Sequence, residues 1–170
     1  APSLVGSEMC IRDRNRVIAG LYSPGSTFKM VVYAAALEAG VISTDTSYNC
    51  KGFFEFGDRD FYCWQEKGHG VVNGRQAIAQ SCDVYFYQIA LKTGIERIHN
   101  MAKRMGLGKI TNVGIPDEKV GIMPNREWKK NTRGTVWTPG ETVIAGIGQG
   151  FVLTTPIQLS VMTARLANGK

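Results

Sequence analysis

The sequence predicts an α+β fold that is mainly helical and carries one small β-hairpin. Apolar runs that stop at a glycine, 30–37 before Gly40 and 84–91 before Gly94, are typical of buried helices. Gly57-Asp58 separates two short aromatic segments, which indicates a two-residue hairpin turn. Thr155-Pro156-Ile157-Gln158 is a capping box with proline at the first helical position, so a helix should begin there.

Each expected element has its own local signal, taken in chain order. A helix over 27–39 follows the turn residues 23–25, and the hairpin occupies 52–63. Helices over 75–80 and 84–92 flank a turn at Ser81, and Gly106 closes a further helix over 95–105. Three prolines make 114–140 loop-rich. The capping box then starts a helix that ends near 167.

The composition is ordinary for one globular unit: 170 residues, 44% hydrophobic and 20% charged, with a formal charge of +6. No apolar run approaches the roughly 18 residues of a membrane span. Basic residues cluster over 126–133 and 103–109, but without the interleaved aromatic residues of a single-strand binder. We therefore expect no nucleic-acid partner. The basic surface could favour an anionic partner such as cell-wall polymer or lipid headgroups.

The residue types and spacing of Ser26-Thr27-Phe28-Lys29 favour an activated serine nucleophile. Residues three apart share one face of a helix, so the Lys29 amine should reach the Ser26 hydroxyl. A serine is a poor nucleophile until an adjacent base takes its proton, and a desolvated lysine can be that base. Taken alone, the motif also fits an N-cap serine followed by a solvated lysine.

A second motif, Ser81-Cys82-Asp83, lies between two apolar-periodic runs. Together with S-x-x-K it resembles the signature shared by class A β-lactamases and penicillin-binding proteins. More widely, the chain resembles the transpeptidase domain of the penicillin-binding protein 2 family, the elongation-specific class B peptidoglycan D,D-transpeptidases. The blocks that carry the resemblance are 15–29, 68–87, 106–116, 137–141 and 146–156.

The resemblance implies the penicillin-binding protein/serine β-lactamase-like transpeptidase fold, helices packed on an antiparallel sheet. Residues 15–170 would be part of that domain, without its C-terminal K-[ST]-G strand region, and residues 1–14 remain unmatched. Lys92-Thr93-Gly94 spells the third motif but is expected at a helix C-terminus, so we reject it. Without that strand the segment alone should be inactive, because a second oxyanion donor would be missing.

The resemblance also implies roles for four residues. Ser26 would attack the carbonyl between the two terminal D-alanines of a stem peptide, and an amine from a neighbouring strand would resolve the serine ester. Lys29 would be the base, and Ser81 would relay a proton to the leaving amine. Asp83 stands where asparagine is commoner and would anchor Lys29. Helix capping is the alternative role for Ser81 and Asp83.

A metal site is also expected. Cys50, Cys63, His69 and Cys82 form a Cys-x12-Cys-x5-His-x12-Cys pattern, and the hairpin should make Cys50 and Cys63 diagonal neighbours on one face. Similarity to a zinc site of some penicillin-binding proteins 2 implies one structural zinc and no open coordination position. A Cys50–Cys63 disulfide and inert buried thiols are the alternatives. No organic cofactor is expected, and His99 should be a surface residue.

The family implies a role in cell elongation and rod shape, with a domain that faces the periplasm from the bacterial inner membrane through an anchor outside this chain. Its ligands would be stem peptides and β-lactams, and its partners a shape-determining glycosyltransferase and the elongation machinery. Two other classes remain as alternatives: a serine β-lactamase, for which 75–131 shows no recognisable deacylating glutamate, and a β-lactam-sensing receptor domain.

Overall fold

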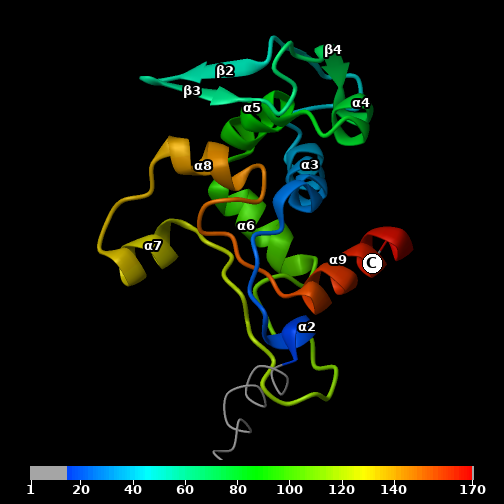
Figure 1. Cartoon of the computed structure of the whole chain (residues 1–170), viewed down its shortest axis with the longest axis vertical. Coiled ribbons are helices and arrows are strands. Elements are labelled where there is room, and N and C mark those ends of the chain that lie inside the picture. Colours follow the sequence, from blue (N-terminus) through cyan, green and yellow to red (C-terminus); the bar gives the residue numbers. More distant parts are fainter. Residues whose placement is uncertain (1–14, 170) are drawn as a thin grey trace, which may run out of the picture.

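The computed structural model describes residues 15–169. Helices form most of this region, and two small antiparallel sheets lie together at one end of the molecule (Figure 1). The short helix α2 (Arg16–Ala19) and the last helix, α9 (Pro156–Asn168), lie toward the other end. The prediction of an α+β fold with a mainly helical body is thus confirmed. The expected unmatched segment 1–14 lies outside the described residues.

The helix α3 (Lys29–Glu38) forms the centre of the helical body and packs against α5 (Asp83–Thr93) and α6 (Ile95–Arg104). It is apolar on nearly all sides, as expected of a helix enclosed by others. Its buried side chains are Lys29, Val31, Val32, Ala35 and Ala36. Full burial of each valine stabilises the fold by about 1.5–3 kcal/mol, so the core itself holds this helix in place.

The first turn before α3 differs from the prediction. Residues Gly25–Phe28 form a separate 3-10 turn, η1, and the α-helix begins only at Lys29. The turn is tight because the Lys29 backbone N–H donates to the Ser26 carbonyl three residues back. At the start of this turn, Gly25 has a φ of +56°, and Thr27 Oγ1 donates a hydrogen bond to the Pro24 carbonyl at 2.7 Å.

The predicted hairpin is confirmed as β2 (Phe53–Phe56) and β3 (Arg59–Tyr62), joined by Gly57-Asp58 with Gly57 at φ +62°. A second antiparallel pair, β1 (Ser47–Cys50) with β4 (Gly70–Asn73), was not predicted. Its strands are four residues long and twenty residues apart, so neither gives a periodic signal of its own.

The helices after the hairpin follow the prediction closely. Asn73 forms a capping box that starts α4 (Gly74–Ala79), and Thr155 forms the expected one for α9. Lys92-Thr93-Gly94 does lie at the end of α5, as expected, so it is not a strand motif. Gly94 has φ +80° and ψ 151°, and therefore ends α5 without the left-handed geometry of the usual glycine cap.

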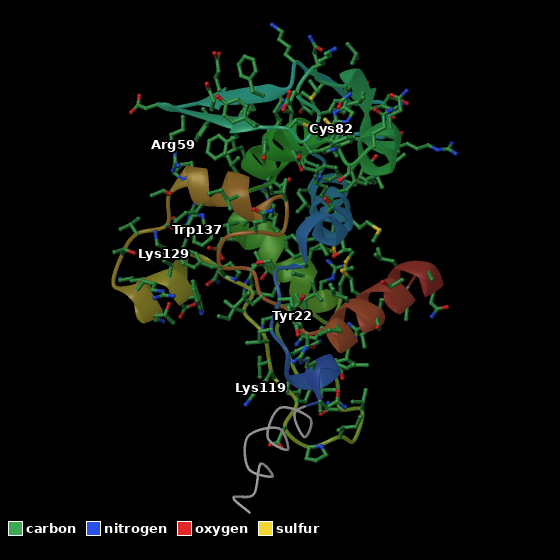
Figure 2. All side chains as sticks on the ribbon, viewed as in Figure 1. Tyr22, Arg59, Cys82, Lys119, Lys129 and Trp137 are labelled. Carbon is green, nitrogen blue, oxygen red and sulfur yellow. The ribbon has the colours of Figure 1, made fainter. Side chains whose placement is uncertain are left out.

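The prediction of a loop over 114–140 was wrong in part. The helix α7 (Arg126–Arg133) begins at the cap Asn125 and ends at Gly134, and α8 (Pro139–Ala145) begins with a Thr138–Glu141 capping box. Figure 2 shows Lys129 and Trp137 on the flank that these helices form. Trp128 and Trp137 both pack on Phe151, at ring-centroid distances of 5.3 and 6.4 Å.

No helix among residues 15–169 is both long and apolar enough to cross a membrane.

Candidate active site and the adjacent thiol cluster

Ser26 lies in the exposed part of η1, immediately before the buried start of α3. The turn is fixed from the side by the loop after α8, because the Gly25 N–H donates to the Gly148 carbonyl at 3.0 Å. A Cβ on Gly148 would lie 2.3 Å from the Gly25 carbonyl oxygen, so only glycine permits this approach. The sequence therefore presents the Ser26 hydroxyl to solvent on a turn held at both ends.

A continuous chain of hydrogen bonds runs from Ser26 into the core. Ser81 Oγ donates to Ser26 Oγ at 2.8 Å, and Lys29 Nζ donates to Ser81 Oγ at 2.9 Å. Lys29 Nζ also donates to the Ser81 carbonyl (2.8 Å) and pairs with Asp83 Oδ1 (2.6 Å). The expected direct reach of Lys29 to Ser26 is replaced by this path through Ser81. All four predicted residues come together.

The ion pair at the base of this chain is shielded from water. The Lys29 side chain is 2% exposed and that of Asp83 is 13% exposed. Because a buried ammonium is costly without partners, the carboxylate and the two Ser81 oxygens account for the burial of Lys29. This also excludes the solvated lysine that the S-x-x-K motif alone allowed.

Ser81 and Asp83 do not cap α5, the alternative role considered for them. Cys82 occupies the cap position and makes no side-chain capping bond, and the Asp83 carboxylate is directed to Lys29 and to the Trp64 backbone N–H. Ser81 has φ +53°, in the left-handed region that non-glycine residues rarely adopt. Such strain is found where a side chain must be aimed at a functional site.

An open cleft of about 650 Å³ lies over Ser26. Apart from Cys63 and the predicted Ser26, Ser81 and Asp83, its lining residues are Tyr62, Trp64, Tyr87, Ile147 and Gln149. Burial raises the pKa of the Tyr87 hydroxyl above its usual range, and that hydroxyl donates to the Tyr62 carbonyl at 3.0 Å. None of these five was predicted as a site residue, although Tyr87, Ile147 and Gln149 lie in blocks that carry the family resemblance.

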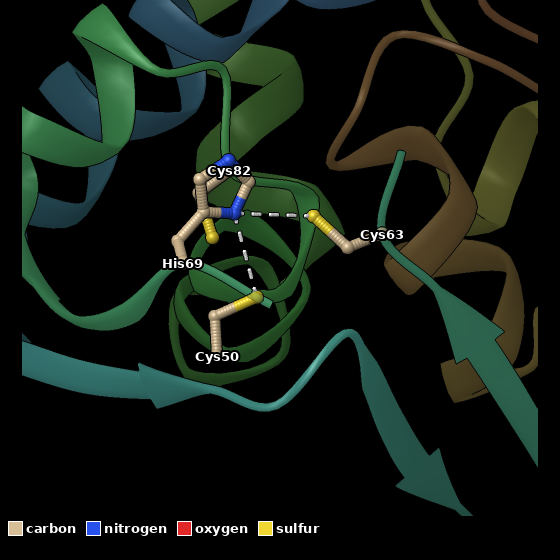
Figure 3. Close-up of side chains that lie close together, drawn as sticks. All are labelled: Cys50, Cys63, His69 and Cys82. Carbon is tan, nitrogen blue, oxygen red and sulfur yellow. Dashed lines mark hydrogen bonds between the residues drawn. The ribbon is translucent and has the colours of Figure 1, made fainter. Parts of the chain in front are cut away.

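The four predicted metal ligands meet in a second cluster beside the cleft (Figure 3). The sulfur atoms of Cys50, Cys63 and Cys82 and one nitrogen of His69 all lie within 4.8 Å of one another. His69 Nδ1 is 3.6 Å from Cys50 Sγ and 3.5 Å from Cys63 Sγ. The three cysteines are buried free thiols.

The strands that bring Cys50 and Cys63 to this cluster differ in one respect from the prediction. Cys63 follows β3 and its N–H donates to the Gly52 carbonyl at 2.8 Å, as the hairpin required. Cys50, however, ends β1 and pairs with Gly70 in the other sheet, so the two cysteines are not diagonal neighbours within one hairpin. The cluster instead joins the two sheets to the start of α5 through Cys82.

The donor set suits a zinc ion. Tetrahedral Zn²⁺ binds thiolates at about 2.3 Å and imidazole nitrogen at about 2.0–2.1 Å, which places neighbouring ligand atoms roughly 3.5–3.8 Å apart. The two sulfur–nitrogen distances agree with this spacing. Burial, together with the neighbouring thiols of Cys50 and Cys63, raises the pKa of the Cys82 thiol to about 12, so a thiolate there needs a cation beside it.

Trp64 lies between the cleft and the thiol cluster. Its ring packs edge-on against His69 at a centroid distance of 5.4 Å, and its side chain is 62% exposed. His99 lies elsewhere: it is half-buried, with Nδ1 3.0 Å from the Met123 carbonyl oxygen, rather than on the surface as predicted.

Comparison with known proteins agrees with this geometry. Residues 4–170 match the model of the penicillin binding protein transpeptidase domain. The chain is 41% identical over 156 residues to the peptidoglycan D,D-transpeptidase MrdA of Acinetobacter baumannii, covering 91% of this chain and 23% of that protein. It therefore spans about a quarter of the length of this relative.

Two solved structures are also similar. Penicillin-binding protein 2 of Pseudomonas aeruginosa, in complex with WCK 5153, superposes with a TM-score of 0.89 at 46% identity, over 91% of this chain and 36% of that one. Penicillin-binding protein 2 of Helicobacter pylori, in complex with MreC, superposes with a TM-score of 0.90 at 39% identity. The match covers 92% of this chain and 30% of that one. The chain belongs to the penicillin-binding protein transpeptidase domain family.

Proposed function

We propose that this chain is the nucleophile-bearing part of a peptidoglycan D,D-transpeptidase that serves cell elongation and rod shape. The observation that carries the proposal is the hydrogen-bond chain from Ser26 through Ser81 to the buried Lys29–Asp83 pair, at the floor of an open cleft. The similarity to a relative named as a peptidoglycan D,D-transpeptidase supports the reaction class.

The geometry supports acyl transfer through Ser26. For attack on the carbonyl between two D-alanines, the Ser26 proton would pass to Ser81 Oγ while the Ser81 proton passes to an uncharged Lys29. The observed bonds run the other way, from Lys29 to Ser81 to Ser26, as fits the ammonium paired with Asp83. Asp83 therefore stabilises the charge that Lys29 acquires on accepting the proton.

The second half of the reaction uses the same path in reverse. When the tetrahedral intermediate collapses, the carbon–nitrogen bond breaks and the leaving D-alanine amine takes a proton from Ser81, which Lys29 replaces. An amine from a neighbouring stem then attacks the ester carbonyl and loses its proton to Ser81 and Lys29. As the ester bond to Ser26 breaks, the same path returns a proton to Ser26 Oγ. Ser81 is suited to both steps because its hydroxyl bridges the nucleophile and the base.

The thiol cluster would hold one structural zinc. Cys50, Cys63, His69 and Cys82 supply four ligand atoms, so no position is left open for a substrate or a water molecule. When bound, the ion would supply a cross-link that joins both sheets to the start of α5. Cys82 lies between Ser81 and Asp83, so this cross-link would stabilise the segment that carries both side chains.

The location and partners that we propose follow from the family. The domain would face the periplasm from the inner membrane, bind stem peptides and β-lactams, and act with a shape-determining glycosyltransferase and the elongation machinery. The similar Helicobacter pylori protein forms a complex with MreC, which supports a protein partner for this domain.

The proposal is tested by supplying the full-length protein with peptidoglycan strands that carry pentapeptide stems. We expect cross-linked dimers and released D-alanine, both detected by mass spectrometry, and neither with Ser26→Ala. Ser23→Ala, which changes an exposed serine of the same loop, is the matched control. Acylation by penicillin followed by rapid drug hydrolysis, without dimers, would instead assign the chain to the β-lactamases. A stable adduct without dimers would favour a sensor.

A further inference from the structure

We propose that Trp64 is a positioning residue for acyl transfer, one that fixes Asp83 and Ser81 in the geometry that the nucleophile needs. The inference rests on the proposed function of Ser26. It comes from three hydrogen bonds that Trp64 donates to the segment 80–83, from a position 16 to 19 residues earlier in the chain.

The first of these bonds fixes the carboxylate. The Trp64 backbone N–H donates to Asp83 Oδ2 at 3.1 Å, while Oδ1 pairs with Lys29 Nζ at 2.6 Å. Both carboxylate oxygens therefore have a defined partner, and rotation about the terminal torsion of Asp83 would break one of the two bonds. The direction in which Lys29 is held depends on this arrangement.

The other two bonds fix the backbone around Ser81. The indole N–H is shared between the Gln80 and Ser81 carbonyls, each at 3.1 Å, and the Ser81 carbonyl also accepts from Lys29 Nζ at 2.8 Å. Ser81 is held at φ +53°, a conformation that is unfavourable for a residue other than glycine. Bonds from both sides of its carbonyl stabilise that conformation and keep its hydroxyl 2.8 Å from Ser26.

Burial in the hydrophobic core does not account for the placement of Trp64. The side chain is 62% exposed, so burial contributes little to holding it there. It follows Cys63 directly and its ring contacts His69, so the thiol cluster sets where the indole lies. Because an exposed ring contributes little to stability, a loss of rate on changing it reports on position rather than on folding.

The test separates binding from chemistry in the full-length protein. Stopped-flow acylation by a fluorescent penicillin gives the dissociation constant of the initial complex and the rate constant of acylation independently. The variants are Trp64→Phe and a protein with benzothienylalanine at position 64, in which sulfur replaces the indole N–H and the ring shape is kept. We expect the acylation rate constant to fall about tenfold in both, a larger change than in the dissociation constant, while the protein stays folded at the assay temperature.

Three outcomes would overturn the inference. A weaker initial complex with an unchanged acylation rate constant would make the ring a ligand contact. A slower acylation in Trp64→Phe, together with the parent rate in the benzothienylalanine protein, would show that the shape of the ring matters and the indole N–H does not. Unchanged kinetics in both variants would remove any positioning role. Absence of a penicillin adduct on Ser26 in the unaltered protein would contradict the proposed function itself, which is a distinct result.

Discussion

Lys29 Nζ lies 2.6 Å from Asp83 Oδ1, although the two residues are 54 positions apart in the chain. The pair joins the first turn of α3 to the first turn of α5, so the packing of these two helices sets its geometry. Ser81 lies between this pair and Ser26, so in the mechanism that we propose the packing of the helical core determines how Ser26 is activated.

Asp83→Ala should destabilise the protein and abolish rapid acylation. It would leave the Lys29 ammonium, 2% exposed, without its counter-charge, and breaking a buried pair in this way costs about 3–5 kcal/mol. Asp83→Asn keeps an acceptor of the same shape and should cost less, while still slowing acylation. Urea unfolding and penicillin acylation measure the two effects. Equal stability of Asp83→Ala and the parent would show that the pair does not form.

Gly148→Ala should slow acylation about 10–100-fold, because the new methyl group would displace the turn that carries Ser26. The added Cβ would lie 2.3 Å from the Gly25 carbonyl oxygen and 2.7 Å from Phe28 Cβ. Gly134→Ala is the matched control, since Gly134 has a similar φ of +67° but open space around it. It should lose about 1 kcal/mol of stability without any change in acylation. Equal acylation rates in the two variants would contradict the account.

The Glu141–Lys129 pair predicts a pH dependence of stability. Burial opposes ionisation of Glu141, but bonds from Lys129 and Thr138 outweigh it and lower the pKa of that carboxyl below its usual 4.5. A lowered folded pKa stabilises the protein fully above the unfolded value, and this contribution is lost as the pH falls through the folded value.

Glu141→Gln should therefore cost about 2 kcal/mol at pH 7, and the difference from the parent should shrink below about pH 4.5. Urea unfolding across a pH series measures this. Glu127→Gln, at an exposed position on α7, is the control and should have little effect at any pH. A constant cost of Glu141→Gln from pH 7 to pH 3 would show that ionisation of Glu141 is not what matters.

Zinc removal is expected to lower the melting temperature by on the order of 5–10 °C, since the ion would bind only the folded state. Native mass spectrometry should find one zinc per chain, absent from Cys50→Ser or His69→Ala, and the ion should dissociate as acid protonates the thiols. A melting temperature that reductant lowers and a chelator does not would instead indicate a Cys50–Cys63 disulfide. A melting temperature that neither the chelator nor the reductant changes would indicate that Cys50, Cys63 and Cys82 are inert buried thiols.

Much of the fold around the site could be predicted from the sequence, because several of its elements have local signals. The turn before Ser26, the glycine-first hairpin and the capping box at Thr155 are each determined by a few adjacent residues. The Thr138–Glu141 capping box has the same pattern as the one at Thr155, with proline at the first helical position in both. The missed helix α8 was therefore predictable.

Other features have no local signal. The β1–β4 pairing joins two strands of four residues, and neither strand is periodic enough to be recognised by itself. Ser81 has a left-handed conformation, and its carbonyl accepts bonds from Lys29 and Trp64, neither of which is near it in the sequence. The role of Ser81 as the link between Lys29 and Ser26 depends on the same tertiary packing. Spacing along one helix had suggested a direct contact instead.

If Ser26 is the nucleophile and Ser81 connects it to Lys29, penicillin should acylate Ser26 at a rate that depends on Ser81. The most direct measurement is peptide mapping by mass spectrometry of the full-length protein after exposure to penicillin, for the parent, Ser26→Ala and Ser81→Ala. We expect a long-lived adduct on the Ser26 peptide, no adduct in Ser26→Ala, and adduct formation slowed at least 100-fold in Ser81→Ala. An adduct on any other residue, or one that forms at the parent rate in Ser81→Ala, would contradict this mechanism.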